Sequence, residues 1–153
     1  MSVPIVVTIV PDGGNLIIVG TNLNDCIDIT STSTGSISVS VNGLPAGSFS
    51  VTPPSGRVIV YTFAGNDCVS MNGPIVLQAD GGADNDTLTG GAGNDVLIGG
   101  MGDDIITGAA GHDVLVGGYG KDRLVGSAGH DILVAGQLSA DYDYAALRAI
   151  SNA

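Results

Sequence analysis

Large aliphatic residues follow two different spacings along this chain. Before residue 81, short runs alternate apolar and polar positions, as in SISVSV at 36–41. A period of two predicts half-buried β-strands. From residue 81 to residue 134 the period becomes nine, which is typical of a solenoid of stacked short strands. The aliphatic residues of this second pattern are Leu88, Leu97, Ile106, Leu115, Leu124 and Leu133.

The segments outside the nine-residue pattern predict further elements. Turn signals rich in Gly and Pro separate the alternating runs, and the turn at 42–47 predicts a hairpin. Beyond residue 134 the period is lost, and apolar residues near helical spacing predict a short helix within 141–153 that caps the solenoid. The predicted strands are 3–10, 15–19, 36–41, 48–52, 57–61 and 75–77.

The nine-residue period consists of six units that follow one another without a gap. Every unit has aspartate at its sixth place and an aliphatic residue at its eighth, and glycine dominates the first, second and fourth places. Two degenerate copies lie at 20–28 and 62–70. From residue 81 onward, the units are GGADNDTLT, GGAGNDVLI, GGMGDDIIT, GAAGHDVLV, GGYGKDRLV and GSAGHDILV.

These units resemble the RTX nonapeptide GGxGxDxUx, in which U is apolar. The resemblance implies an all-β fold, a right-handed parallel β-roll or β-solenoid. We expect an irregular, hairpin-bearing half at 1–80, six tandem repeats at 81–134 and a C-terminal cap or tail at 135–153. Two consecutive units should close one coil, with the eighth place inward and the seventh and ninth outward.

Stacked coils would align the sixth-place aspartates in two columns. Carboxylates one strand spacing apart repel by roughly 0.8 kcal/mol in bulk water, and by several times more in a lower dielectric. A divalent cation with oxygen ligands converts this repulsion into coordination, and calcium suits the site better than magnesium. The predicted aspartate ligands are Asp86, Asp95, Asp104, Asp113, Asp122 and Asp131, with Asp67 extending the first column and Asp25 left open.

Glycines are predicted to supply the rest of the metal site. At the first, second and fourth places they permit positive φ, which can turn backbone carbonyls toward a cation. The resemblance implies that each aspartate is shared between successive ions. The complete pairs of units begin at 81/99, 99/117, 90/108 and 108/126, which suggests about four or more Ca²⁺ ions. The predicted glycine contributors are Gly82, Gly91, Gly93, Gly100, Gly102, Gly111, Gly118, Gly120 and Gly129.

Composition narrows the class of partner. A net charge of −11 and only four Lys and Arg argue against binding to nucleic acid or anionic membranes. No stretch reaches the length of apolar sequence that a membrane span requires, so no membrane insertion is expected. The apolar run 3–10 lacks the flanks of a signal peptide and is interpreted as a buried strand. No catalytic motif is recognised, so we expect no enzymatic activity.

Outward places of alternate repeats are unexpectedly apolar, more so than a soluble monomer usually exposes. Either the C-terminal segment or the N-terminal hairpin covers this face, or it is a surface for self-association or for a partner. The apolar face consists of Val96, Ile98, Val114, Val116, Ile132 and Val134.

Two pairs of residues occupy equivalent places in different repeats. Cys26 and Cys68 both take the seventh place of a degenerate copy, which allows either a disulfide or two free thiols. His112 and His130 both take the fifth place, in units one full coil apart, and should stack. Zinc binding is conceivable there, although solvated turn residues are the simpler interpretation.

The sequence therefore predicts a calcium-binding, calcium-folded extracellular module with a structural or interaction role. A sharper version is a self-assembling matrix, surface or filament subunit. The alternative is a secretion or folding module of a larger secreted enzyme, toxin or adhesin. The resemblance also implies secretion by the type I route, to the cell surface or the medium.

Overall fold

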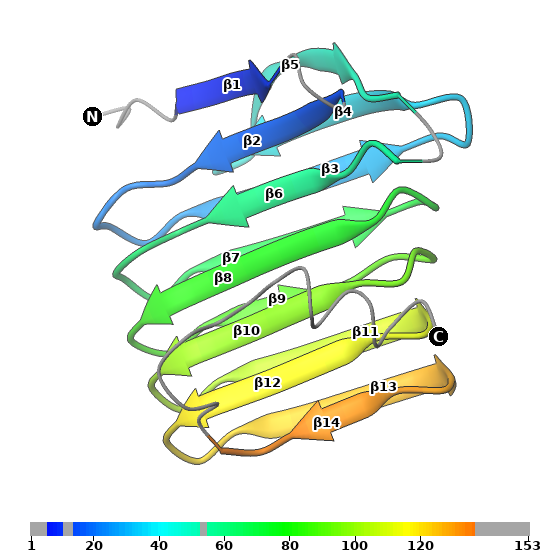
Figure 1. Cartoon of the computed structure of the whole chain (residues 1–153). Helices are drawn as coiled ribbons and strands as arrows, with labels where there is room; N and C mark the ends of the chain where they lie inside the picture. Colours follow the sequence, from blue (N-terminus) through cyan, green and yellow to red (C-terminus); the bar gives the residue numbers. More distant parts are fainter. Residues whose placement is uncertain (1–5, 11–13, 53–54, 137–153) are drawn as a thin grey trace.

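The chain folds into a β-solenoid whose two walls are seven-stranded sheets (Figure 1). This computed structural model describes residues 6–10, 14–52 and 55–136, and these contain no helix. Among them, no helix offers the length and hydrophobicity of a membrane span. The all-β solenoid is confirmed, whereas the cap helix expected within 141–153 lies outside the described residues.

The chain alternates between the walls, so each wall collects every second segment. The first sheet, in spatial order, consists of β1 (Val6–Val10), β2 (Asn15–Val19), β6 (Val58–Tyr61), β8 (Leu77–Ala83), β10 (Val96–Met101), β12 (Val114–Tyr119) and β14 (Ile132–Val134). The second consists of β13 (Arg123–Gly129), β11 (Ile105–Gly111), β9 (Thr87–Thr89), β7 (Cys68–Asn72), β3 (Cys26–Ser31), β4 (Ser36–Val41) and β5 (Leu44–Ser50).

The repeats stack in register with a stagger of two units. Leu97 pairs with Leu115 in the first sheet, and Ile106 pairs with Leu124 in the second. Two units therefore close one coil, as predicted. Several strands are longer than the three residues that the repeat suggests, because the first places of the following unit continue the strand, as Gly99–Met101 do in β10.

The interior of the solenoid is a narrow column of aliphatic side chains. Eighth-place Leu88, Leu97, Ile106 and Leu115 are fully buried and belong to one continuous core with residues of the N-terminal half. Leu133 is 46% exposed, and among the described residues β14 pairs only with β12. The core thus depends on coils stacking above and below each other.

The N-terminal half departs from the regular roll through antiparallel pairs. β4 pairs antiparallel with β3 and β5, and β1 pairs antiparallel with β2. The predicted hairpin is confirmed, but its turn is Asn42-Gly43 rather than 42–47. Both residues have positive φ, 51° and 75°, which is the geometry of a two-residue hairpin turn.

A disulfide joins the first two parallel strands of the second sheet. Cys26 on β3 and Cys68 on β7 are register partners, with Cα atoms 4.5 Å apart. The bond answers the question that the sequence left open. It crosslinks the segment at 20–28 to the segment at 62–70 across a sequence separation of 42. A crosslink of this length restricts the unfolded chain and stabilises the fold by roughly 2–4 kcal/mol.

The apolar face of the first sheet is mostly buried. Val96, Ile98, Val114 and Val116 are at most 1% exposed and form a second cluster with the partly buried Val134, separate from the solenoid core. The β4–β5 hairpin extends the second sheet, so it does not cover this face. The expected self-association surface is therefore inaccessible at four of its six residues, and Ile132 alone is exposed, at 37%.

Candidate metal centre

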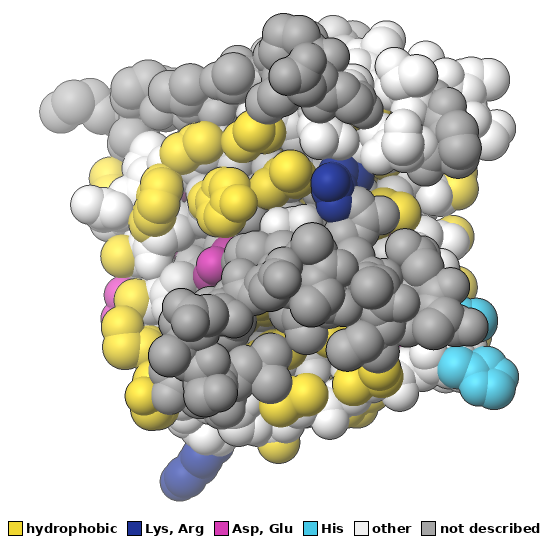
Figure 2. All heavy atoms as spheres, viewed as in Figure 1, with side chains coloured by type: hydrophobic (Ala, Val, Ile, Leu, Met, Phe, Trp, Pro, Cys, Tyr) yellow, Lys and Arg dark blue, Asp and Glu magenta, His cyan; other side chains and the backbone are white. Residues whose placement is uncertain are grey.

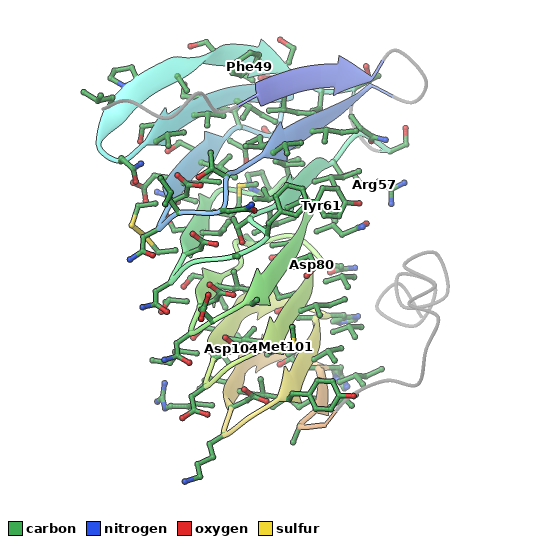
Figure 3. The ribbon with its side chains drawn as sticks, turned by 90° about the vertical axis from the view of Figure 1, so that its left-hand side faces the viewer. Phe49, Arg57, Tyr61, Asp80, Met101 and Asp104 are labelled. Atoms are coloured by element: carbon green, nitrogen blue, oxygen red, sulfur yellow. A yellow bond between two sulfur atoms is a disulfide. The ribbon has the colours of Figure 1, made fainter. Side chains whose placement is uncertain are left out.

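The turns between the walls carry the sixth-place aspartates in two columns, as predicted. Figure 3 looks onto one row of turns, with Asp104 labelled. One carboxylate oxygen, Oδ1, accepts a backbone N–H from the preceding coil. The N–H of Asp86 donates to Asp104 at 2.8 Å, and that of Asp95 donates to Asp113 at 2.8 Å. Equivalent bonds join Asp25 to Asp67, Asp67 to Asp86, Asp104 to Asp122 and Asp113 to Asp131.

The second carboxylate oxygen, Oδ2, has no partner at most steps of the columns. A buried polar atom without a hydrogen bond costs about 1–3 kcal/mol, and a charged one costs more. Because an unpartnered Oδ2 recurs along the columns, this free-energy cost is repeated from coil to coil. The repetition indicates that a cation binds these oxygens in the stable protein. The buried, unpartnered Oδ2 atoms belong to Asp67, Asp86, Asp104, Asp113 and Asp122.

First-place glycines create the space around these oxygens. A Cβ on Gly99 would collide with Oδ2 of Asp104 and would approach the carbonyl oxygen of Gly117 to 2.7 Å. The same arrangement recurs at Gly81, Gly90 and Gly108, each beside the aspartate of its own unit and the first-place carbonyl of the next coil. An anionic oxygen, a neutral carbonyl and a gap that only glycine leaves open fit a calcium ion.

The first-place glycines were not among the predicted contributors. Their φ angles are not positive, so they are required for space and not for conformation. The sequence carried the signal, because this place is glycine in all six units. The four complete spaces fall at the pairs 81/99, 90/108, 99/117 and 108/126, which are the pairs that the repeat register predicted.

The second- and fourth-place glycines lie in the turns beside the columns. Most have positive φ, for example 117° at Gly100 and 131° at Gly102, as does Asp84 at 77°. Gly91 and Gly93 do not. The Gly91 carbonyl accepts the N–H of Ala110 at 3.0 Å, so part of its capacity is already used. Metal ligation by Gly82, Gly91, Gly93, Gly100, Gly102, Gly111, Gly118, Gly120 and Gly129 stays a prediction.

Asp25 differs from the other members of its column. Its Oδ2 accepts the backbone N–H and the hydroxyl of Thr21, each at 2.8 Å. Thr21 occupies the second place, where the repeat has glycine. At 20–28, therefore, hydrogen-bond donors of the chain itself serve the carboxylate that would otherwise need a cation. Asp95, which begins the other column, also has a partner for Oδ2, the N–H of Gly91 at 2.8 Å.

The fifth places form a second hydrogen-bonded ladder that sequence reasoning missed. The Asn85 side chain accepts the N–H of Asp103 in the next coil at 2.7 Å, and the Asp103 side chain accepts that of Lys121 at 2.8 Å. The fifth-place side chains accept N–H groups of the following coil, whereas the sixth-place carboxylates accept N–H groups of the preceding coil. Each turn is thus tied in both directions. His112 and His130 lie one above the other as predicted, with ring centroids 5.5 Å apart and the rings edge to face at 67°.

Burial makes the aspartates reluctant to ionise in the absence of metal. Desolvation raises the pKa of Asp86 and of Asp95 to about 7 and that of Asp67 to about 6. Burial also raises the pKa of Asp104 and Asp113, and a neighbouring carboxylate of the same column adds to the rise. In the metal-free columns, burial and neighbouring carboxylates therefore disfavour the ionised form of the aspartates. A bound cation would favour that form.

Comparison with known families agrees with this geometry. Residues 80–115 and 107–137 match the model of the RTX calcium-binding nonapeptide repeat, in four copies. Comparisons with curated proteins and with solved structures found no match. Among the described residues no three His, Cys, Asp or Glu side chains converge as a metal site. The candidate centre instead combines one carboxylate per unit with backbone carbonyls.

Asp104→Asn tests the role of the columns, because it keeps an acceptor for the Asp86 N–H but removes the anionic charge. We expect the calcium concentration at the folding midpoint to rise at least about tenfold, since ligand charge sets calcium affinity. Asp103→Asn is the matched control. It removes the same charge one residue away, at an exposed place where other units carry asparagine, and should shift the midpoint by less than about twofold. Equal shifts would show that only overall charge matters.

The raised pKa values also predict how the calcium-free protein responds to pH. Between the ordinary aspartate pKa and about 7, the folded state binds more protons than the unfolded state, so its stability falls as pH rises. In chelator, β-structure measured by circular dichroism should be greater at pH 5 than at pH 8. In Asp86→Asn/Asp104→Asn the difference should shrink, because two of the titrating groups are gone. An unchanged difference in that variant would assign the effect to general charge repulsion.

Proposed function

We propose that this protein is a calcium-folded extracellular module with a structural or interaction role and no catalytic activity. The observation that carries the proposal is the series of buried Oδ2 atoms without partners. It recurs with the period of the coils and lies beside spaces that first-place glycines keep open. Calcium would take these oxygens and the adjacent carbonyls as ligands.

The energetics favour coupled binding and folding. Two carboxylates about 5 Å apart repel by roughly 3 kcal/mol at an effective dielectric constant of 20, and every added coil brings another such contact. The aliphatic core is narrow, and its hydrophobic contribution has to offset chain entropy as well. Calcium removes the repulsion and adds its own binding energy to the folded state, so the repeats should be largely unfolded without it.

The register supports about four calcium ions or more, one at each complete pair of units stacked in adjacent coils. Asp67 continues the first column of carboxylates, but Thr62 stands at the first place of its unit and donates its hydroxyl to the Gly81 carbonyl at 2.7 Å, so this step lacks the space that a first-place glycine leaves for an ion. The segment at 20–28 needs no ion, since the backbone N–H and the hydroxyl of Thr21 donate hydrogen bonds to Oδ2 of Asp25. The N-terminal half then has its own means of stability: the disulfide, antiparallel strands and a satisfied first carboxylate.

An extracellular location is supported by the Cys26–Cys68 disulfide, since such bonds persist in oxidising compartments. Extracellular fluids also hold the free calcium that weak sites need. RTX repeats are typical of secreted proteins, and we extend to this chain their export by the type I route. Asp86, Asp95, Asp104 and Asp113 of the columns are at most 1% exposed, which suits a structural ion and not a reacting substrate.

The second candidate is a secretion or folding module of a larger secreted enzyme, toxin or adhesin. The exposed Leu133 and Ile132 on the last described coil favour it, because this end of the stack leaves apolar surface that a further coil would cover. Self-assembly through the apolar face receives less support, because most of that face is already buried within one chain.

Hydrogen exchange followed by mass spectrometry tests the proposal at the level of segments. With calcium, amides at 15–50, 58–72 and 81–134 should all be protected. In chelator, protection should vanish at 81–134 but persist at 15–50, where the hairpins and the disulfide remain. Magnesium at the same concentration should not restore it.

Reduction of the disulfide provides the matching control. In chelator it should remove the remaining protection at 15–50, whereas in saturating calcium 81–134 should stay protected. Equal protection of 81–134 with and without calcium would contradict the proposed calcium-folded module. Simultaneous loss in both halves on chelation would contradict the independent stability of the N-terminal half.

A further inference from the structure

Thr62 stands at the first place of its unit, where all six regular units carry glycine. It follows β6 directly and is fully buried, whereas hydrophobic side chains gather at the surface over β2 and β6 in Figure 2. Its φ is not positive, so the backbone does not require glycine at this position. A buried hydroxyl needs a hydrogen-bond partner inside the protein, and that partner shows what the side chain does.

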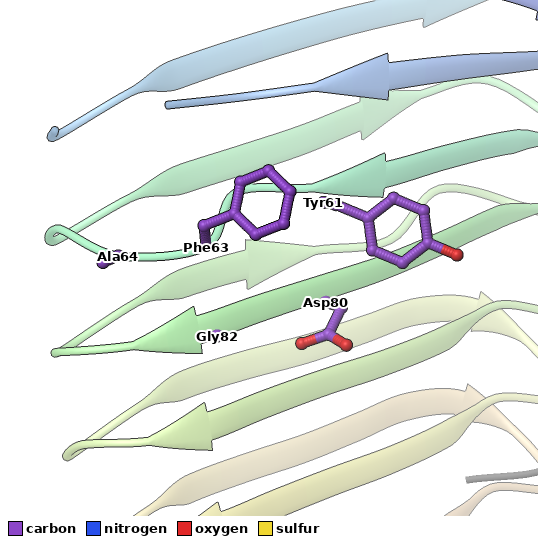
Figure 4. Close-up of a pocket in the computed structure, with 5 residues that line it drawn as sticks. All are labelled: Tyr61, Phe63, Ala64, Asp80 and Gly82. Carbon is purple, nitrogen blue, oxygen red and sulfur yellow. The ribbon is translucent and has the colours of Figure 1, made fainter. Parts of the chain in front are cut away.

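Gly81 lies opposite Thr62 in the next coil, because the preceding residues, Tyr61 and Asp80, are register partners. The Thr62 N–H donates to the Asp80 carbonyl at 3.1 Å, and the Thr62 hydroxyl donates to the Gly81 carbonyl at 2.7 Å. The hydroxyl therefore bridges the two coils at the first place. Figure 4 shows residues of both segments: Tyr61, Phe63 and Ala64 from the coil of Thr62, and Asp80 and Gly82 from the coil of Gly81.

The Thr62 side chain meets the same two groups that frame each open space in the regular units. At Gly99, a Cβ would meet Oδ2 of the aspartate in its own unit and the first-place carbonyl of the next coil. The corresponding groups here are Oδ2 of Asp67 and the carbonyl of Gly81. Burial raises the pKa of Asp67 to about 6, and the nearby Thr62 side chain offsets part of the rise.

The acidic oxygen of this step is left unused. The Thr62 hydroxyl has one proton, which it donates to Gly81, and Oδ2 of Asp67 is buried without a hydrogen bond. One side chain thus fills the space and serves the carbonyl, but it does not serve the carboxylate. A carboxylate oxygen and a carbonyl, the two groups that fit calcium at the regular steps, are both present here.

Threonine also replaces a cation at the preceding step, by a different route. The unit at 20–28 keeps glycine at its first place, but Thr21 at the second place donates two hydrogen bonds to Oδ2 of Asp25. One threonine therefore serves the carboxylate at 20–28, and another serves the carbonyl at 62–70. Glycine leaves the space open from Gly81 onward.

We propose that Thr62 closes a latent calcium site between the units 62–70 and 81–89, and that it sets the point in the stack at which calcium dependence begins. This inference rests on the proposed binding of calcium to the regular units. Calcium lies roughly 2.3–2.6 Å from its oxygen ligands, so it cannot share the space with a threonine side chain. The segment at 58–72 therefore stays folded with the N-terminal half when calcium is removed, and the first calcium-dependent step of this column is the pair 81/99.

Thr62→Gly tests whether the site is latent, because it opens the space and frees the Gly81 carbonyl. We expect the variant to bind one calcium ion more per chain than the parent protein, measured by elemental analysis after equilibrium dialysis at a fixed free calcium concentration. Thr62→Ser keeps the hydroxyl and is the matched control, with the parent number of ions. An equal count in Thr62→Gly and the parent would overturn the proposal. A parent protein that binds no calcium would contradict the proposed function, and this inference with it.

Asp67→Asn tests the same site without relying on Thr62→Gly alone. It keeps an acceptor for the Asp25 N–H but removes the anionic charge. In the parent protein the calcium count should not change, whereas in the Thr62→Gly background the gained ion should be lost. Loss of an ion from the parent on this substitution would overturn the proposal, because Asp67 would then already be a ligand.

Hydrogen exchange in chelator tests where calcium dependence begins. Amides at 58–72 should stay protected in the parent protein. In Thr62→Gly their protection should fall at least about tenfold, because the Gly81 carbonyl loses its donor, and calcium should restore it. Equal loss of protection at 58–72 in the parent and the variant would overturn the proposed boundary.

Discussion

Like charges stacked at the spacing of β-strands are the constraint on which this structure depends. In each of the two columns, every coil places one sixth-place carboxylate directly over the next, and one oxygen of each is tied to a backbone N–H of the preceding coil. The other oxygen is left buried and unpartnered at five steps. Such an arrangement is unfavourable for a protein without a cation, and it becomes the organising interaction once calcium is bound.

The two halves of the chain meet this constraint in different ways. In the regular half, glycine at the first place leaves room for an ion and nothing in the chain substitutes for it. In the N-terminal half, Thr21 donates two hydrogen bonds to Asp25, and the disulfide fixes the adjacent coil in register. The N-terminal half can therefore present a preformed edge, β7 and β8, on which calcium-dependent coils add one after another. Such stepwise growth is expected of solenoids, whose coils contact only their neighbours.

The sequence was sufficient for the features that follow from periodicity. The two-unit coil, the two aspartate columns and the inward eighth place all derive from one repeat with glycine turns. It was insufficient where individual side chains decide the outcome. The role of first-place glycine is steric and appears only when the next coil is in place, as at Gly99 and Gly117. The pairing of Cys26 with Cys68 depended on an irregular insertion, and the burial of Val96 and Val114 depended on tertiary packing.

A far-UV circular dichroism titration of the whole chain with calcium and, separately, with magnesium tests most directly whether calcium folds the repeats. We expect a partly folded protein in chelator, because the N-terminal half is stable alone. Calcium should then add β-signal in a cooperative transition, and magnesium at the same concentration should not. A spectrum in chelator that already equals the calcium-bound spectrum would contradict the central claim, and the aspartate columns would then be turn-forming residues only.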